Sequence, residues 1–151
     1  MKPQLAAIVV IVLLASGCRA PGEPPSHPAQ GEYQDLIRRE VDAAGGALST
    51  CVLVLHYVDQ DRVPAPYTRV VLRQAANDLR KVSQDLSQIT PPPRAARAHA
   101  SFLAIALRDR SRLDHLAKEP NNTLARHAVS AALSADAATL RDRLTRQLDP
   151  A

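Results

Sequence analysis

Residues 72–93 read LRQAANDLRKVSQDLSQITPPP, and they contain the clearest periodic pattern in the chain. Apolar residues recur there at alternating intervals of three and four positions, a spacing that places them on one face of an α-helix. They are Leu72, Ala75, Leu79, Val82, Leu86 and Ile89. The prolines at 91–93 then end the helix, because proline lacks an amide hydrogen and disfavours helical geometry in the preceding residue. This segment therefore predicts an amphipathic helix that packs against other helices.

A pattern of the same kind precedes it, between residues 37 and 58. Its members are Ile37, Val41, Ala44, Leu48, Cys51, Leu55 and Val58. Gly45 and Gly46 interrupt this pattern, and residues 50–58 are rich in β-favouring side chains, for which a strand is the alternative. We predict a helix here, in which the two glycines let a neighbouring helix approach closely.

Two further helices are predicted after the prolines. The first runs from about Arg94 to Lys118 and is rich in Ala and Arg. A turn at 119–122 follows, in which Asn121 or Asn122 is suited to cap a last helix that ends near Leu148. The side chains expected in the core are Phe102, Leu103, Ala106, Leu113 and Leu116 in the first of these helices, and Leu133, Ala137, Leu140, Leu144 and Leu148 in the second.

The composition supports a helical fold. The 151 residues include 26 Ala and 19 Leu, whereas aromatic residues make up only 3%. Helices pack well through small and aliphatic side chains, whereas a β-sandwich usually needs more aromatic and β-branched residues. Pro64 and Pro66 mark another helix start, and short connections favour antiparallel neighbours. We therefore predict an all-α protein, an antiparallel up-down four-helix bundle that spans residues 32–150.

The N-terminal residues have the order of a signal peptide. Met1 and Lys2 precede an apolar run at residues 5–15, and small residues follow it. This run of 11 residues is shorter than the roughly 20 that a helix needs to cross the hydrocarbon core of a bilayer. We therefore predict that residues 1–17 form a signal peptide and not a permanent membrane span.

The run Leu14-Ala15-Ser16-Gly17-Cys18 resembles the lipobox of bacterial lipoproteins, with Ala15 in place of the more usual Leu. The resemblance implies that Cys18 is lipidated and that the precursor is cut immediately before it. Several acyl chains on one residue anchor a protein stably, whereas a single chain holds it only marginally. An ordinary secretory signal with a chance cysteine is the alternative.

The residue after the cysteine bears on the destination. Lipoproteins of organisms with two membranes generally stay in the inner membrane only when Asp follows the cysteine, and here the residue is Arg19. The resemblance thus implies the outer membrane, facing the periplasm, in such an organism, and the outer face of the plasma membrane in an organism with one membrane. Residues 18–31 contain four Pro and two Gly, and we predict that they form a flexible tether that reaches up to roughly 40 Å.

The five histidines invite a metal hypothesis, but none lies three or four residues from another. Helical metal sites usually present two ligands at that spacing on one face. We therefore predict no metal site and no cofactor. The alternative is a periplasmic ligand or metal sensor, in which His99, His115 or His127 converges with Asp109 or Asp136 across the bundle. In the simpler interpretation His99 is a hydrogen-bonded polar residue at the margin of the bundle.

Cys51 lies on the apolar face of the first helix, so we predict a buried core residue. The alternative is a thiol that pairs with another chain, because an acylated Cys18 has no thiol left for a disulfide.

Motifs for nucleophilic or phosphate chemistry are absent from the sequence, so we predict no enzymatic activity and no catalytic residue. Carboxylates occur singly and often near Arg, as in residues 108–112 and 141–143. Such runs favour solvated helix faces with ion pairs inside one helix.

The charge gives little support for nucleic-acid binding. The formal net charge is +4, and removal of residues 1–17 deletes Lys2 and leaves 18 basic against 15 acidic residues. Basic and acidic residues alternate, and aromatic residues that could stack on bases are scarce. We expect no nucleic-acid partner.

These observations favour a membrane-anchored envelope lipoprotein whose helical module binds another envelope protein or serves structurally. Its general plan is similar to that of small helical lipoproteins of unassigned function and of some secretin pilotins. We expect the docking place in an apolar groove between the second and third helices, near residues 91–94.

Overall fold

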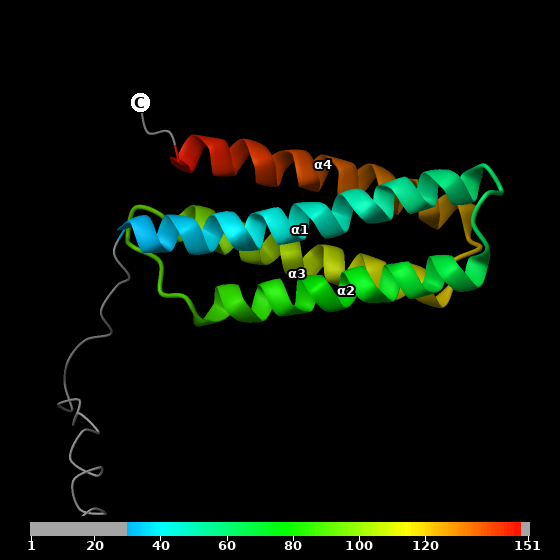
Figure 1. Cartoon of the computed structure of the whole chain (residues 1–151), viewed down its shortest axis with the longest axis horizontal. Coiled ribbons are helices and arrows are strands. Elements are labelled where there is room, and N and C mark those ends of the chain that lie inside the picture. Colours follow the sequence, from blue (N-terminus) through cyan, green and yellow to red (C-terminus); the bar gives the residue numbers. More distant parts are fainter. Residues whose placement is uncertain (1–29, 149–151) are drawn as a thin grey trace, which may run out of the picture.

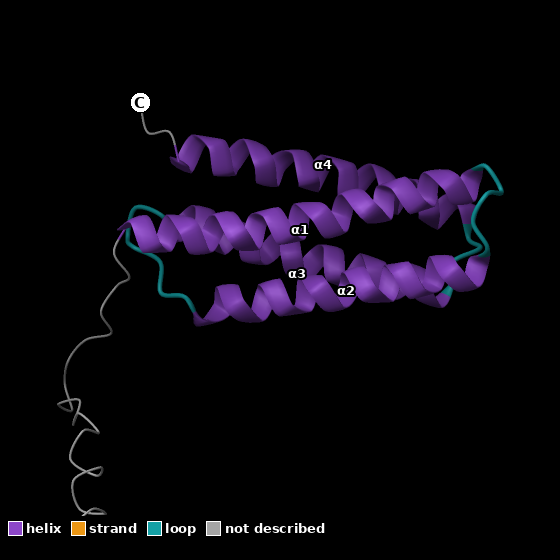
Figure 2. Ribbon diagram, viewed as in Figure 1, coloured by secondary structure: helices purple, strands orange, loops and turns teal. Residues whose placement is uncertain are grey.

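The computed structural model describes residues 30–148. They form four α-helices, α1 (Gln30–Asp59), α2 (Ala65–Gln88), α3 (Ala96–Lys118) and α4 (Thr123–Leu148) (Figure 2). No strand occurs among these residues, and residues 50–58 belong to α1, so the predicted all-α fold is confirmed. Residues 30 and 31, which were placed in the predicted tether, are helical. The predicted signal peptide and Cys18 lie outside the described residues.

The four helices run alternately in opposite directions, as the predicted up-down topology requires (Figure 1). α1 lies between α2 and α4 and packs against both. α3 closes the bundle by packing extensively against α2 and less extensively against α4. The predicted four-helix bundle is therefore confirmed, and its α3–α4 interface is the smallest of the four.

The core contains the residues that the periodic patterns placed on inner faces. In α1 and α2 all of them are buried except Val58 and Ile89, which end the two patterns and are half-buried. In α3 and α4 only Leu103 is half-buried among those described, and the side chain of Leu148 lies outside the described part. Phe102 is the largest fully buried side chain. Burial of these apolar side chains is the main favourable contribution to folding.

Gly45 and Gly46 do not mark a close approach between helices. A Cβ atom built on either residue would meet nothing within 4 Å, and both residues are part of continuous helix in α1. The prediction that they bring a neighbouring helix close is therefore wrong. Gly46 instead borders open space between α1 and α2.

Local hydrogen bonds explain where α1 ends and where α4 begins. After α1, the amide of Arg62 donates to the carbonyl of Tyr57 at 3.0 Å, and Asp61 adopts a φ of 56°. A left-handed residue in this position closes the last helical turn. At α4, the side-chain oxygen of Asn122 accepts a hydrogen bond from the amide of Ala125 at 3.0 Å. Of the two asparagines considered for the N-cap, Asn122 therefore has this role.

By length and composition alone, α1 is apolar enough to cross a membrane. The segment Gly31–Asp59 contains an 18-residue window with a mean hydropathy of 1.4. The apolar face of α1 instead packs in the core against α2 and α4. A core helix passes this test as readily as a membrane helix does, so the bundle accounts for the hydropathy of α1.

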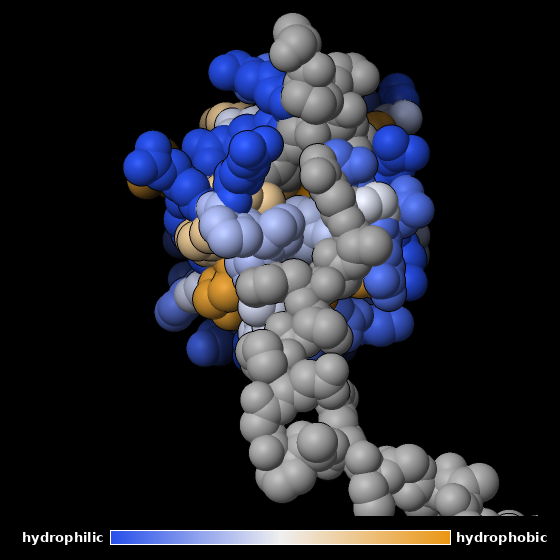
Figure 3. Space-filling view, turned by 90° about the vertical axis from the view of Figure 1, so that its left-hand side faces the viewer, coloured by the Kyte–Doolittle hydropathy of each residue, from blue (hydrophilic) through white to orange (hydrophobic). Residues whose placement is uncertain are grey.

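The end of the bundle at which α1 begins is mostly hydrophilic where it is open to view (Figure 3). α3 also begins at this end, and α2 and α4 finish there (Figure 1). Arg94 and Arg97, at the start of α3, are exposed. The predicted tether therefore joins the bundle at a polar end.

Candidate functional site

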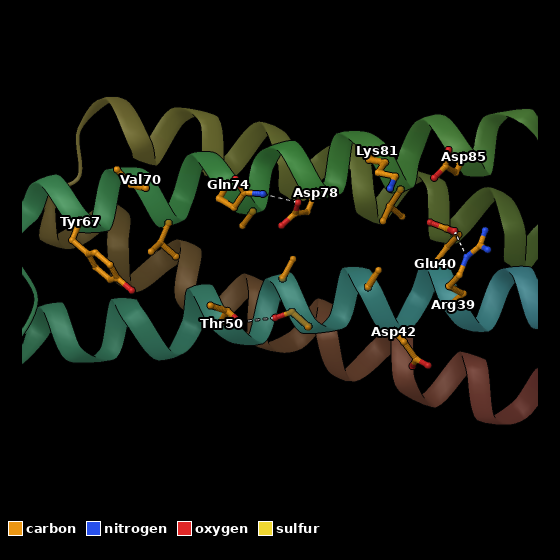
Figure 4. Close-up of a pocket in the computed structure, with 16 residues that line it drawn as sticks. Arg39, Glu40, Asp42, Thr50, Tyr67, Val70, Gln74, Asp78, Lys81 and Asp85 are labelled. Carbon is orange, nitrogen blue, oxygen red and sulfur yellow. Dashed lines mark hydrogen bonds and ion pairs between the residues drawn. The ribbon is translucent and has the colours of Figure 1, made fainter.

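A spacious groove lies between α1 and α2 (Figure 4). Its volume is about 970 Å³. We call it the α1–α2 groove, and it is lined by α1 residues between Arg39 and Thr50 and by α2 residues between Tyr67 and Asp85. At about 1.5 Å per residue, the α2 wall is roughly 27 Å long. The groove is therefore long enough to accept a short helix.

Small side chains create this groove. Ala43, Gly46 and Ala47 face it from α1, and no side chain of α1 fills the space beside Gly46. On the α2 side, the buried residues Ala75 and Val82 contribute to its lining. Close packing of α1 with α2 therefore continues below the groove, while the surface above it stays open.

One end of the groove is apolar. Tyr67 and Val70, which are 55% and 65% exposed, line this end, and Val71 beside them is half-buried. In Figure 4, Tyr67 extends from α2 toward α1. Neighbouring exposed apolar side chains that lie in a concavity are typical of a contact surface, whereas single ones are common anywhere.

The rest of the groove is charged and mostly acidic. Asp42, Asp78 and Asp85 line it, and none of them has an ion-pair partner among residues 31–146. The amide nitrogen of Gln74 donates to Asp78 at 2.9 Å, as Figure 4 shows. Lys81 is the lining cation without an ion-pair partner in this part of the chain. The charge of the groove is thus opposite in sign to the net charge of the whole chain.

Arg39 and Glu40, which also line the groove, pair with each other. The Nε atom of Arg39 lies 3.0 Å from Glu40, whose side chain is buried. These two charges offset each other, so the acidic character of the groove comes from the three aspartates.

The position of the groove differs from the prediction. We expected a docking groove between α2 and α3 near residues 91–94, but the spacious groove lies between α1 and α2. α2 and α3 form the most extensive helix–helix interface of the bundle, and His99 of α3 bonds directly to the carbonyl of Leu86. The sequence pattern had marked the α2–α3 junction because of its prolines, which end α2 without opening a groove.

His99 is a buried, hydrogen-bonded residue, as the simpler interpretation predicted. Its Nε2 atom lies 3.0 Å from the carbonyl oxygen of Leu86, and its Nδ1 atom lies 3.3 Å from the hydroxyl of Tyr33. A carbonyl oxygen can only accept, so Nε2 donates to Leu86 and Nδ1 is left to accept from Tyr33. Burial raises the pKa of Tyr33 to about 12. His99 is therefore engaged in holding α1, α2 and α3 together.

The other described histidines lie apart from His99. His115 and His56 are exposed, and His127 pairs with Asp59, from Nε2 to Oδ2 at 3.1 Å. Within residues 30–148, no group of three or more His, Cys, Asp or Glu side chains is placed to hold a metal ion. Among the described residues, the structure thus does not bring His99, His115 and His127 together into a metal site.

Cys51 is fully buried in the core, which confirms the structural interpretation of this residue. Burial, together with the negative charge of Asp78, raises the pKa of the Cys51 thiol to about 12. A protonated, inaccessible thiol is a poor nucleophile and a poor partner for another chain.

Asp109 differs from what the sequence predicted. Its side chain is 0% exposed, although we had placed it on a solvated face of the run at 108–112. Arg112 donates from Nη1 to Oδ1 of Asp109 and to Oδ2 of Asp136 on α4, both at 2.7 Å. Arg108 donates to the other oxygen of Asp136 at 2.6 Å. The predicted ion pairs inside one helix do occur here, between Arg112 and Asp109 and between Arg110 and Asp114. What the prediction missed is that Asp109 is buried and that Arg108 and Arg112 also pair with Asp136 of α4.

The second aspartate-arginine run behaves as predicted. Asp142 and Arg146 are exposed and form an ion pair across one turn of α4, at 2.5 Å.

A sequence signal for the burial of Asp109 does exist. Phe102, Ala106, Leu113 and Leu116 lie on the inner face of α3, and position 109 falls in the same spacing, three residues after Ala106 and four before Leu113. The local composition of 108–112 favoured a surface interpretation, whereas the helical period favoured the interior. The α1–α2 groove had no comparable signal, since its walls come from residues that are far apart in the sequence.

Comparisons of this chain with protein-family models, with curated proteins and with solved structures gave no match.

Proposed function

We propose that this protein is a bacterial envelope lipoprotein, anchored in a membrane through lipidated Cys18, whose helical bundle binds a partner protein in the α1–α2 groove. The partner segment is an amphipathic helix that carries apolar side chains at one end and basic side chains at the other. The observation that carries the binding role is the combination of exposed Tyr67 and Val70 with unpaired aspartates in one concave surface.

The anchor rests on the N-terminal sequence. The order of a positive end, an apolar run, small residues and Cys18 is what a lipoprotein signal requires. Residues 19–29 then provide a proline-rich connection to the first residue of α1. A tethered protein samples its partners close to a surface, where even a modest affinity is effective because the local concentration is high.

A helix is the occupant that suits the shape of the groove. Grooves between two helices accept an amphipathic helix, which places apolar residues at every third or fourth position into the floor. The groove offers a roughly 27 Å wall of α2, the length of about 18 helical residues. An extended strand would need unpaired backbone groups on the protein, and helices α1 and α2 offer none along this surface.

The charge of the occupant follows from the charge of the groove. Asp78 and Asp85 line the groove without an ion-pair partner among the described residues, so a partner with Lys or Arg at matching positions gains favourable contacts. Asp42 lies at the edge of the groove, and its carboxylate points away from α2 in Figure 4. A second copy of this chain docked groove to groove fits less well, because that symmetric contact would bring the aspartates of the two grooves together.

The anchor is tested by replacing Cys18 by Ser in the full chain and fractionating the cells. We expect wild-type protein in the membrane fraction and the variant outside it, with the signal sequence retained, because the cut depends on prior lipidation. Equal membrane association of both proteins would refute the anchor. The matched control is C51S, which removes a thiol that is buried and should leave the distribution unchanged.

The groove is tested by photo-crosslinking in whole cells. A crosslinking amino acid at Val70 should give a specific adduct, whereas the same group at Leu124, which is 84% exposed on α4, should not. The adduct should map by mass spectrometry to a helical segment with Lys or Arg residues. Combining the Val70 probe with D78K and D85K should abolish it, since the groove charge is then reversed.

Three outcomes would overturn the binding proposal. They are an adduct with a second copy of this chain, an adduct with lipid alone, and an adduct that persists unchanged after the charge reversal. Because the anchor and the groove are tested with different variants, failure of one leaves the other result interpretable.

A further inference from the structure

The α3–α4 interface contains two carboxyl groups that meet inside the bundle. Asp109 comes from the inner face of α3 and is fully buried, and Asp136 comes from α4 with 15% of its side chain exposed. One nitrogen of Arg112 contacts both of them, at 2.7 Å each. The two carboxyl groups are therefore close neighbours in the smallest helix–helix interface of the bundle.

The hydrogen bonding of this cluster is incomplete in one place. Both oxygens of Asp136 are bonded, one to Arg108 at 2.6 Å and the other to Arg112 at 2.7 Å. For Asp109, Oδ1 is bonded to Arg112, but buried Oδ2 has no hydrogen-bond partner among the described residues. A buried oxygen without a donor is costly, because it has lost its water and gained nothing in return.

A proton on Asp109 would remove this cost. Two ionised carboxylates are both acceptors and cannot bond to each other, but a protonated Asp109 carries a hydroxyl that can donate to Asp136. The two carboxyl groups lie close together, because an oxygen of each is 2.7 Å from the same Nη1 atom of Arg112. Protonation also removes one of two like charges in a confined space.

The ionisation properties agree with this geometry. Burial, followed by the influence of Asp136, raises the pKa of Asp109 to about 6, although Arg112 opposes the rise. Burial also acts to raise the pKa of Asp136, but the hydrogen bonds from Arg108 and Arg112 outweigh it and lower that pKa below its ordinary value. The charged groups with the largest influence on Asp109 are Arg112 of its own helix and Asp136 of α4.

We propose that Asp109 and Asp136 form a proton-dependent latch, in which one proton shared by the two carboxyl groups tightens the α3–α4 interface in mildly acidic conditions and its loss loosens that interface. The proton comes from solvent and returns to it, so no other reactant is needed. Arg108 and Arg112, which are 47% and 34% exposed, keep Asp136 ionised as the acceptor.

The consequence is a bundle whose α4 responds to pH while α1, α2 and α3 stay packed. α3 is held to α2 by an extensive interface, whereas α4 meets α3 through few contacts and this cluster. α4 also remains tied to α1, including through Arg126, which donates to Asp59 at 2.9 Å. Loosening therefore affects the edge of α4 that faces α3. This latch is independent of the α1–α2 groove and of the anchor.

The test measures the proton and the interface separately, in the full chain kept in mild detergent. Carbon NMR of the Asp109 carboxyl group should show a midpoint near pH 6. Amide hydrogen exchange of α4, corrected for the intrinsic rate, should be about tenfold slower near pH 5 than near pH 7.5, since the closed interface binds the proton more tightly than the open one.

Variants complete the test. In D109N the amide can donate to Asp136 without a proton, so α4 exchange should be slow at both pH values. D142N removes an exposed carboxylate of α4 and should keep the wild-type pH response. A titration midpoint of Asp109 below about pH 4.5, close to the ordinary value of an aspartate, would overturn the proposal. So would a pH response of α4 exchange that survives in D109N. The titration midpoint is available even if a variant folds poorly, because it is measured on the wild-type protein.

Discussion

His99 and Asp109 are both polar residues that the bundle buries, and the structure satisfies them to different degrees. Each ring nitrogen of His99 has a partner, whereas one carboxyl oxygen of Asp109 has none among the described residues. A buried polar group with all its hydrogen-bond partners destabilises the fold little and makes the packing specific. A buried group without such partners destabilises the fold unless its protonation state changes. His99 therefore has a structural role, whereas the protonation of Asp109 responds to pH.

Replacing His99 by Ala should destabilise the protein by about 2 to 4 kcal/mol, because the change leaves a cavity and removes the partners of the Tyr33 hydroxyl and the Leu86 carbonyl. The loss is measured as a lower midpoint in chemical denaturation followed by circular dichroism. H115A is the matched control, since His115 is exposed and its replacement should change stability by less than about 0.5 kcal/mol. Equal stability of H99A and wild type would show that these hydrogen bonds contribute nothing.

α1 serves two purposes as an element. Its apolar face forms the centre of the core between α2 and α4, and its flank with Ala43, Gly46 and Ala47 forms one wall of the α1–α2 groove. A helix can do both because residues 100° apart on its surface face different neighbours. The small residues that open the groove cost α1 some of its intrinsic stability, with glycine the least favourable of them.

Replacing Gly46 by Ala should stabilise the bundle by about 0.5 to 1 kcal/mol, since alanine has the higher helix propensity. No steric cost opposes this gain, because a Cβ atom at position 46 meets nothing within 4 Å. The measurement is the free energy of unfolding in urea. A43G, on the same exposed face, should lose a similar amount, and a loss of stability in G46A would contradict the open space beside this residue.

For the molecule as a whole, the four interfaces are unequal in kind as well as in size. α2 and α3 meet extensively, whereas α3 and α4 meet less and are joined by ion pairs such as Arg108 with Asp136. Apolar contacts respond little to pH, whereas buried charges respond strongly. The stability of the bundle should therefore depend on pH mainly through one side of the molecule.

The free energy of unfolding should fall by about 3 kcal/mol in total as the pH rises from about 3 to about 7, most steeply between about 4 and 6, and it should then stay level as far as Asp109 is concerned. The sign follows from the raised pKa of Asp109, about 6 in the folded protein against an ordinary 3.8. The folded state holds the proton more tightly than the unfolded chain does, so the stabilisation is complete below the lower value and is lost through the higher one. Urea denaturation at several pH values measures it, and the difference between wild type and D109N isolates this residue. If the difference in unfolding free energy between wild type and D109N does not change between about pH 4 and pH 6, Asp109 does not have a raised pKa in the folded protein.

Much of the fold could be predicted from the sequence because its determinants are local. The alternation of three and four positions identified the inner faces of α1 and α2, and the prolines at 91–93 and the asparagine at 122 marked helix boundaries. Period, capping and proline geometry act over a few residues, so they can be recognised before the chain folds. The lipobox resemblance is likewise a property of consecutive residues, and it remains a prediction.

The sites depend on neighbours that only folding brings together. The arginines around Asp109 in the sequence favoured an exposed position. In the structure, the packing of α3 buries Asp109 near Asp136 of α4. The α1–α2 groove joins residues 39–50 to residues 67–85, and its depth reflects how α1 and α2 pack around small side chains. Sequence by itself determined the helices and their buried faces, because these follow from short-range periodicity. Tertiary structure alone determined which polar groups share the interior and where the surface stays open, because burial and electrostatics depend on distance in space and not on separation along the chain.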